Sequence, residues 1–213
     1  AGIDGGAFDN CANLKTVTFE EGTTEIAEGL FAGCTGIEQI RIPDTVTVIE
    51  SGAFGGCINL KEITVPDNVT EIQRSAFEYC SSLKTAKLSE NLKSIGIWAF
   101  GDCNVLKSIK IPDSVTDIDG NAFAECKELS DVILSKNLKT MGWQVFGNDN
   151  KLTEIEIPKS LEECRYSVNS AGIDGGAFDN CANLKTVMFE EGTTEIAEGL
   201  FAGCTGIEQI RIP

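Results

Sequence analysis

The sequence contains no histidine and has only two tryptophans and two tyrosines, and these scarcities limit its chemistry. Without histidine, the chain lacks the most common general base, pH switch and metal ligand of proteins. Catalytic arrangements of the Ser-His-Asp or Cys-His type are excluded for the same reason. No G-x-x-x-x-G-K-S/T phosphate-binding loop occurs either. Because nothing singles out a catalytic pair among the 33 acidic residues, we expect a protein that is not an enzyme and binds no cofactor.

Basic residues and long apolar runs are also scarce. The chain has 17 basic and 33 acidic residues, which gives a formal net charge of −16. Proteins that bind nucleic acid use Lys and Arg to neutralise phosphates, so nucleic acid is not an expected partner. No stretch of 18 consecutive apolar residues occurs, and we therefore expect no membrane span.

Cysteine is abundant, but its spacing argues against a metal site or disulfides. Zinc sites usually contain close pairs such as C-x-x-C, and the nine cysteines form none. Eight of them lie three residues after a recurring phenylalanine: Cys11, Cys34, Cys57, Cys80, Cys103, Cys126, Cys181 and Cys204. Side chains stacked in one column point the same way, which is unsuited to bridging. We expect buried thiols that act as small hydrophobic residues and weak donors.

A repeat of fixed length organises the chain. Phenylalanine recurs at 8, 31, 54, 77, 100, 123, 146, 178 and 201, and every interval is 23 residues except the 32 between Phe146 and Phe178. Such a period is typical of a solenoid. Each unit reads Phe-x-x-Cys-x-x-Leu-x-x-Ile-x-Ile-Pro-x-x-Val-x-x-Ile. The alternation in Leu-x-x-Ile-x-Ile predicts a short strand with one buried face, and the Val-x-x-Ile part predicts a second, shorter one.

The stack that follows from these units has about nine coils. Parallel strands lie about 4.8 Å apart, so nine coils extend about 40 Å. The residues around each phenylalanine leave room for a tight turn and not for a helix. In the long interval, Leu161 and Cys164 take the Val and Ile positions before nine extra residues, so we expect an inserted loop at 165–172 on an unbroken stack. Asp149 replaces the column cysteine one coil earlier.

Residues 171–213 repeat residues 1–43 with one difference, Met188 in place of Thr18. Neither end of the chain has the polar capping repeat that a free solenoid needs. We therefore expect a single domain over 1–213 that belongs to a longer array. Its uncapped ends would allow end-to-end self-association.

Units such as Ala122–Cys126 and Leu60–Ile72 resemble the BspA-like leucine-rich repeats, the 23-residue bacterial class. The resemblance covers the chain apart from the 165–172 loop. It implies an α/β-type leucine-rich repeat solenoid, a right-handed curved stack with a parallel sheet on its concave side and little or no regular helix. It also implies a bacterial cell-surface or secreted protein that adheres to host or matrix proteins. The family has no catalytic residues to transfer to this chain.

Charge placement indicates where a partner would bind. The nine predicted long-strand segments carry a net charge of +3, whereas the remaining residues carry −19. Six charged residues are predicted to point outward from these strands, a basic stripe followed by an acidic one: Arg41, Lys87, Lys110, Asp131, Glu154 and Glu156. A polarised face can steer a charged partner. The alternative is that these charges only keep an exposed sheet soluble.

Trp98 and Trp143 lie just before their repeat phenylalanines and are two further candidates. Tryptophan is a favoured anchor at interfaces, which predicts an apolar contact patch. The alternative is half-buried packing against the local turn. The sequence as a whole predicts a non-enzymatic protein-binding scaffold that uses many shallow contacts. A structural stalk or spacer without a ligand is the alternative.

Overall fold

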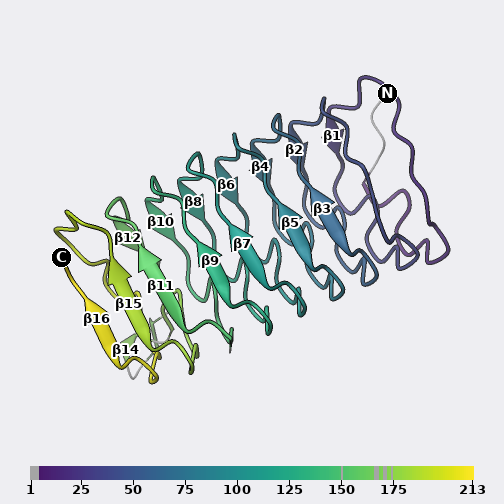
Figure 1. Ribbon diagram of the computed structural model, residues 1–213. Coiled ribbons are helices and arrows are strands. Elements are labelled where there is room, and N and C mark those ends of the chain that lie inside the picture. Colours follow the sequence, from purple (N-terminus) through teal and green to yellow (C-terminus); the bar gives the residue numbers. More distant parts are fainter. Residues whose placement is uncertain (1–4, 150, 166–167, 170–171, 174) are drawn as a thin grey trace.

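The computed structural model describes residues 5–149, 151–165, 168–169, 172–173 and 175–213. It confirms the predicted solenoid, because successive coils stack along one axis from the N-terminus to the C-terminus (Figure 1). Within the described residues there is no helix, and all strand pairs are parallel except one hairpin. None of this part of the chain could therefore cross a bilayer as a helix.

Each coil contributes up to two strands, and these lie on two different sides of the stack. The short strands form one continuous seven-stranded parallel sheet. Its members are β1 (Glu25–Ile26), β2 (Val48–Ile49), β4 (Glu71–Ile72), β6 (Ser94–Ile95), β8 (Asp117–Ile118), β10 (Thr140–Met141) and β12 (Glu163–Cys164). Consecutive members pair in register at intervals of 23 residues, as in Glu25 with Val48 and Val48 with Glu71.

The long strands lie on the other side and form three smaller parallel groups, β3-β5, β7-β9 and β11-β15-β16. They are β3 (Glu62–Thr64), β5 (Thr85–Lys87), β7 (Ser108–Lys110), β9 (Asp131–Ile133), β11 (Glu154–Ile157), β15 (Thr186–Phe189) and β16 (Gln209–Arg211). The predicted alternation holds in β7, where Ile109 is buried between exposed Ser108 and Lys110. We call the outward side of these seven strands the long-strand face.

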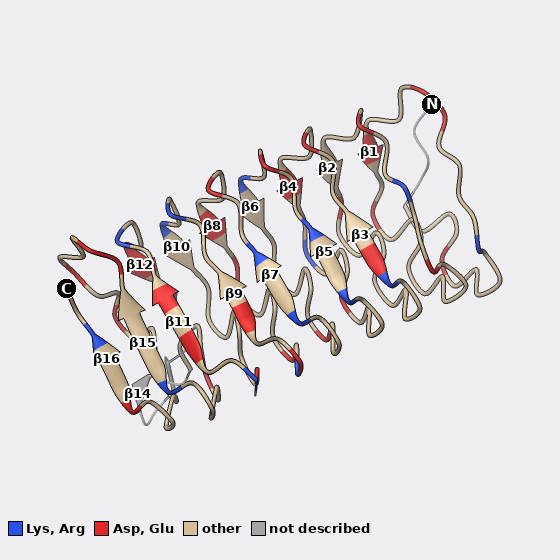
Figure 2. Cartoon of the chain, viewed as in Figure 1, with Lys and Arg blue, Asp and Glu red and all other residues tan. Residues whose placement is uncertain are grey.

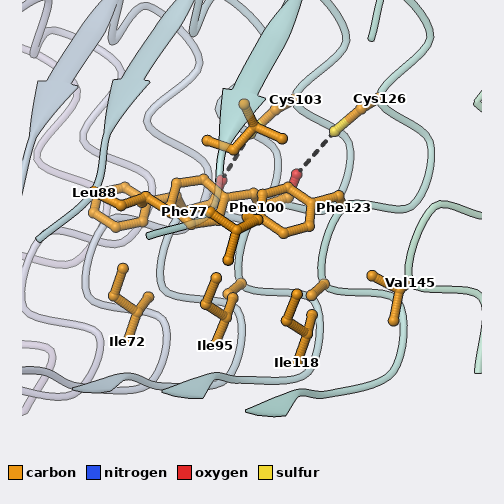
Figure 3. Close-up of a cluster of buried hydrophobic side chains, with 14 of the residues drawn as sticks. Ile72, Phe77, Leu88, Ile95, Phe100, Cys103, Ile118, Phe123, Cys126 and Val145 are labelled. Atoms are coloured by element: carbon orange, nitrogen blue, oxygen red, sulfur yellow. Dashed lines mark hydrogen bonds between the residues drawn. The ribbon is translucent and has the colours of Figure 1, made fainter. Parts of the chain in front are cut away.

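A continuous column of phenylalanine rings forms the centre of the core. Nine rings, from Phe8 to Phe201, stack with centroid distances of 5.1–5.7 Å, so eight turns separate the first ring from the last. This agrees closely with the predicted number of coils. Figure 3 shows three of the rings in a row beside the buried isoleucines of the short strands. Stacked aromatic pairs of this kind contribute about 0.5–1.5 kcal/mol each beyond their burial.

The segment around each phenylalanine is a tight turn, as expected, and it requires two left-handed residues in most coils. Positive φ angles recur two residues before the phenylalanine, as at Gly52 and Asn121, and two residues after it, as at Gly56 and Asn148. Glycine and asparagine adopt this conformation at low cost. Trp98 occupies the first of these columns with φ of 58°, which is unusual for a bulky side chain.

The long interval after Phe146 leaves the stack unbroken, as predicted. The rings of Phe146 and Phe178 are 5.3 Å apart, and β11 pairs with β15 across the inserted residues. The insertion contains an antiparallel hairpin of β13 (Val168–Asn169) and β14 (Gly172–Ile173). Arg165, at the start of the insertion, forms an ion pair with the stack: the Arg165 guanidinium lies 3.2 Å from the carboxylate of Asp119, two coils earlier.

Two predicted long strands are absent. The segments 14–19 and 37–42 adopt no regular strand, although seven segments of the same pattern do. In Figure 1 residues 14–19 lie apart from the neighbouring coil, and residues of both segments line an open groove. The alternation predicts which side chains face the core, but a strand also needs a partner that lies in register.

Candidate binding face

Seven of the eight column cysteines are structural thiols, but the prediction of a buried thiol is wrong for Cys11, which is exposed. All nine cysteines are free. In seven of the eight column positions the Sγ atom donates to the carbonyl oxygen of the phenylalanine one coil earlier, at 3.0–3.4 Å, as for Cys103 and Cys126 in Figure 3. Burial raises the pKa of the Cys57 thiol to about 12, and those of Cys80, Cys103 and Cys126 also rise. Because the thiolate is the nucleophile, this column is unsuited to covalent chemistry.

Asp149 is the exception in this column. Its side chain is completely buried, and neither carboxylate oxygen has a hydrogen-bond partner in the described structure. Burial raises the pKa of this carboxyl well above its usual 3.8, and the nearby carboxylate of Glu125 raises it further, whereas the backbone N–H of Cys126 opposes the shift. Asp149 is thus a buried residue of the core, in the position that cysteine takes in other coils.

The long-strand face brings five of the eight candidate residues together. Lys87 ends β5 and Lys110 ends β7, while Asp131 begins β9 and Glu154 and Glu156 lie on β11. All five side chains are exposed. Figure 2 shows blue strand ends on β5 and β7 and red segments on β9 and β11. Two residues of the predicted basic stripe therefore lie on strands next to those of the predicted acidic stripe.

The remaining candidates lie elsewhere. Arg41 belongs to the segment that forms no strand, where it lines an open groove of about 850 Å³ together with Lys15 and Glu62. Trp98 and Trp143 are half-buried in the turns before their phenylalanines, and neither lies on the long-strand face. The ring of Trp98 lies against Gly101, and that of Trp143 lies against Gly120. A Cβ atom at Gly120 would approach the Trp143 ring to 2.8 Å, so the missing side chain makes room for it.

Sequence reasoning did not single out Ile133 of this face, or two lysines that directly precede its strands. Lys84 and Lys107 precede β5 and β7 and are also exposed, which gives four lysines on two neighbouring coils. Ile133 at the end of β9 is 54% exposed and pairs in register with Lys110. Its place follows from the same alternation that placed Asp131, because residues two apart on a strand share a face. An apolar residue between two charged ones in the same outward column was therefore a usable signal.

The fold defines the class of protein first: a solenoid of short parallel strands with a leucine-rich repeat pattern. Comparison with known families then identifies it further. The chain matches the BspA type leucine rich repeat region in six copies, over residues 1–105, 47–171 and 162–213. It therefore belongs to the BspA type leucine-rich repeat family, as the resemblance of its units predicted. No curated protein sequence matches it.

Solved bacterial structures share the fold. A leucine-rich repeat protein from Bacteroides ovatus is 30% identical with a TM-score of 0.76, over 97% of this chain and 57% of that one. A leucine rich cell surface protein from Faecalibacterium prausnitzii is 28% identical with a TM-score of 0.55, over 98% and 62%. The T. pallidum leucine rich repeat protein is 29% identical with a TM-score of 0.68, over 80% and 77%. This chain thus spans under two thirds of the length of the first two relatives.

Proposed function

We propose that this chain is a non-enzymatic protein-binding scaffold of a bacterial cell-surface or secreted, adhesin-like protein. The observation that supports it is the long-strand face, where Lys87 and Lys110 lie on strands next to those of Asp131, Glu154 and Glu156. Family membership supports it too, and one of the similar proteins is described as a cell surface protein. The mechanism would be avidity, since weak contacts repeated along a stack add up once one of them has formed.

Binding to immobilised host extracellular matrix proteins tests this proposal. Lys87→Glu places a negative charge on the long-strand face. Lys93→Glu makes the same change six residues further along the same coil, beside the short strand β6. Both lysines are exposed, and neither has an ion-pair partner among the described residues. We expect wild type and the Lys93→Glu variant to bind a matrix protein with equal affinity. The Lys87→Glu variant should bind the same protein about tenfold more weakly.

A structural stalk or spacer is the competing function, and the unbroken phenylalanine column with its seven-stranded sheet favours it. A stalk predicts that no matrix protein binds, and that result would replace the scaffold by the spacer. Equal binding of both charge-reversal variants would keep the scaffold function but would remove the long-strand face as its binding site. Trp98 and Trp143 form a separate prediction of a second contact, which Trp98→Ala and Trp143→Ala would test in the same binding measurement.

A further inference from the structure

Charge in the long strands and in the residues next to them is sorted by strand. The segments that contain β5 and β7, residues 83–88 and 106–111, carry four lysines and no acidic residue. The segments that contain β9 and β11, residues 129–134 and 152–157, carry three acidic residues and no basic one. The face therefore changes sign between β7 and β9, in the middle of the stack.

This sorting differs from the charge pairing in neighbouring coils. On the same side of the stack, Lys61 pairs with Glu38 and Lys185 pairs with Glu208, each across one coil. Of the seven sorted side chains, only Lys110 has an ion-pair partner in the described part of the chain, Glu90 at 4.0 Å. Like charges on adjacent strands are mildly destabilising, so a face that only had to stay soluble would gain by mixing them.

An exposed apolar side chain marks the place where the sign changes. One column of outward residues runs through Lys87, Lys110, Ile133, Glu156 and Met188. Ile133 is more than half exposed there, with a lysine on one side of it and a glutamate on the other. A central apolar contact surrounded by charged groups is the usual anatomy of a protein-binding site.

We propose that the long-strand face binds an extended protein segment along the stack axis, with acidic residues over Lys87 and Lys110, an apolar residue over Ile133 and basic residues over Glu154 and Glu156. This inference rests on the proposed protein-binding function and specifies the partner. Three coil steps separate Lys87 from Glu156, about 14 Å at the strand spacing of parallel sheets. An extended segment covers that distance in about four residues. The acidic and basic parts of the partner are therefore only a few residues apart.

Three synthetic peptides of matched length test this order, by fluorescence anisotropy with the full 213-residue chain at low ionic strength. The block peptide is Asp-Asp-Ser-Leu-Ser-Lys-Lys. The mixed peptide, Asp-Lys-Ser-Leu-Ser-Asp-Lys, has the same composition and net charge. The glycine peptide replaces the leucine of the block peptide. We expect the block peptide to bind about tenfold more tightly than the mixed peptide, and this advantage to shrink as salt screens exposed charges.

Variants of the chain separate the electrostatic from the apolar contribution. Lys87→Glu with Lys110→Glu should abolish the advantage of the block peptide, whereas Lys93→Glu should preserve it. Ile133→Ser should remove the preference for leucine over glycine while it leaves the block-over-mixed preference intact. All these side chains are exposed, so circular dichroism should show unchanged folding.

The possible results differ in what they overturn. Equal binding of block and mixed peptides, or no peptide binding, would overturn the proposed charge order. If a matrix protein then still bound in a Lys87-dependent way, the scaffold function would stand without it. An unchanged leucine preference in Ile133→Ser would remove Ile133 from the site and overturn the proposed apolar contact.

Discussion

Residues 5–43 and 175–213 have the same sequence apart from one residue, yet they are buried in opposite patterns. In the first copy, Ile26 is fully buried in β1 and Phe8 is 41% exposed. In the second copy, the equivalent Ile196 is 48% exposed and the equivalent Phe178 is fully buried. Each coil of a solenoid packs only on its neighbours, so the burial of a residue depends on which side of its coil is covered.

The strands also differ between the two copies. Residues 186–189 of the second copy form β15, which pairs with β11 on one side and β16 on the other. The matching residues 16–19 of the first copy form no strand. Conversely, residues 25–26 form β1 against β2, whereas residues 195–196 form no strand. The same residues therefore adopt a strand in one copy and not in the other, although residues 37–42 have a coil on each side and still form none.

Four experiments test how far the neighbouring coils control these differences.

The largest effect is expected at the phenylalanines. Phe178 lies between the rings of Phe146 and Phe201, whereas Phe8 contacts only Phe31 in the column. Phe178→Ala should cost about 3–5 kcal/mol of unfolding free energy, and Phe8→Ala about 1 kcal/mol. Urea denaturation followed by tryptophan fluorescence measures both. Equal losses would show that burial in the stack does not control stability.

In the next experiment the first copy, and not the second, should be the more sensitive to mutation. Ile26→Ala removes a fully buried side chain of the first copy, while Ile196→Ala truncates a half-exposed one in the second. We expect a loss of about 2–4 kcal/mol for Ile26→Ala and less than about 1 kcal/mol for Ile196→Ala. The second copy would thus be the sensitive one at phenylalanine and the insensitive one at isoleucine. A result in which one copy is more sensitive at both positions would contradict the neighbour rule.

These two pairs also show how far the sequence predicts the fold. Period, alternation and the recurring Phe and Cys predict the stack, both kinds of strand and the uninterrupted core across the insertion, because these depend on local pattern. The unpaired segments 14–19 and 37–42 could not be predicted from that pattern. Their sequence recurs in the second copy apart from Met188 in place of Thr18, and strands do form there.

The candidate site could be predicted in part. Alternation correctly placed Lys87, Lys110 and Glu156 on one face, because strand periodicity determines the direction of side chains. It could not show that Arg41 lies apart in a segment without a strand. It also could not decide whether Trp98 is packed or exposed. The ring of Trp98 lies against Gly101, three residues later in the same tight turn. That contact depends on backbone φ angles, which a repeat pattern does not reveal.

A third experiment concerns Asp149, which lies beside Cys181 of the second copy in the place of a column cysteine. Its two buried carboxylate oxygens have no hydrogen-bond partner in the described structure, which lowers the stability of the fold. A thiol at this position would avoid that loss. Asp149→Cys should therefore stabilise the chain by about 1–3 kcal/mol at pH 7. Because the folded pKa of Asp149 lies above its ordinary value of 3.8, the protonated form is favoured on folding. This contribution is fully present below about pH 4 and is lost as the pH rises through the folded pKa.

The advantage of Asp149→Cys over wild type should accordingly grow from pH 4 upward, as measured by urea denaturation at several pH values. Asp149→Asn is the control, since it has the same shape and no charge, and it should remove the same pH dependence without restoring a thiol. An advantage that stays constant with pH would mean that ionisation of Asp149 does not oppose folding.

The smallest effect is expected at the one residue that differs between the copies. Met188 lies in β15, in register with Glu156 and Arg211, and is only half-buried. Met188→Thr makes the copies identical and should change the unfolding free energy by less than about 0.5 kcal/mol. Amide hydrogen exchange then compares 186–189 with 16–19. We expect the protection of 186–189 to persist. Threonine favours strands more than most residues do, yet the copy that carries it at 18 has no strand there. Loss of protection in Met188→Thr would trace the difference between the copies to this side chain, and not to the coil that packs against it.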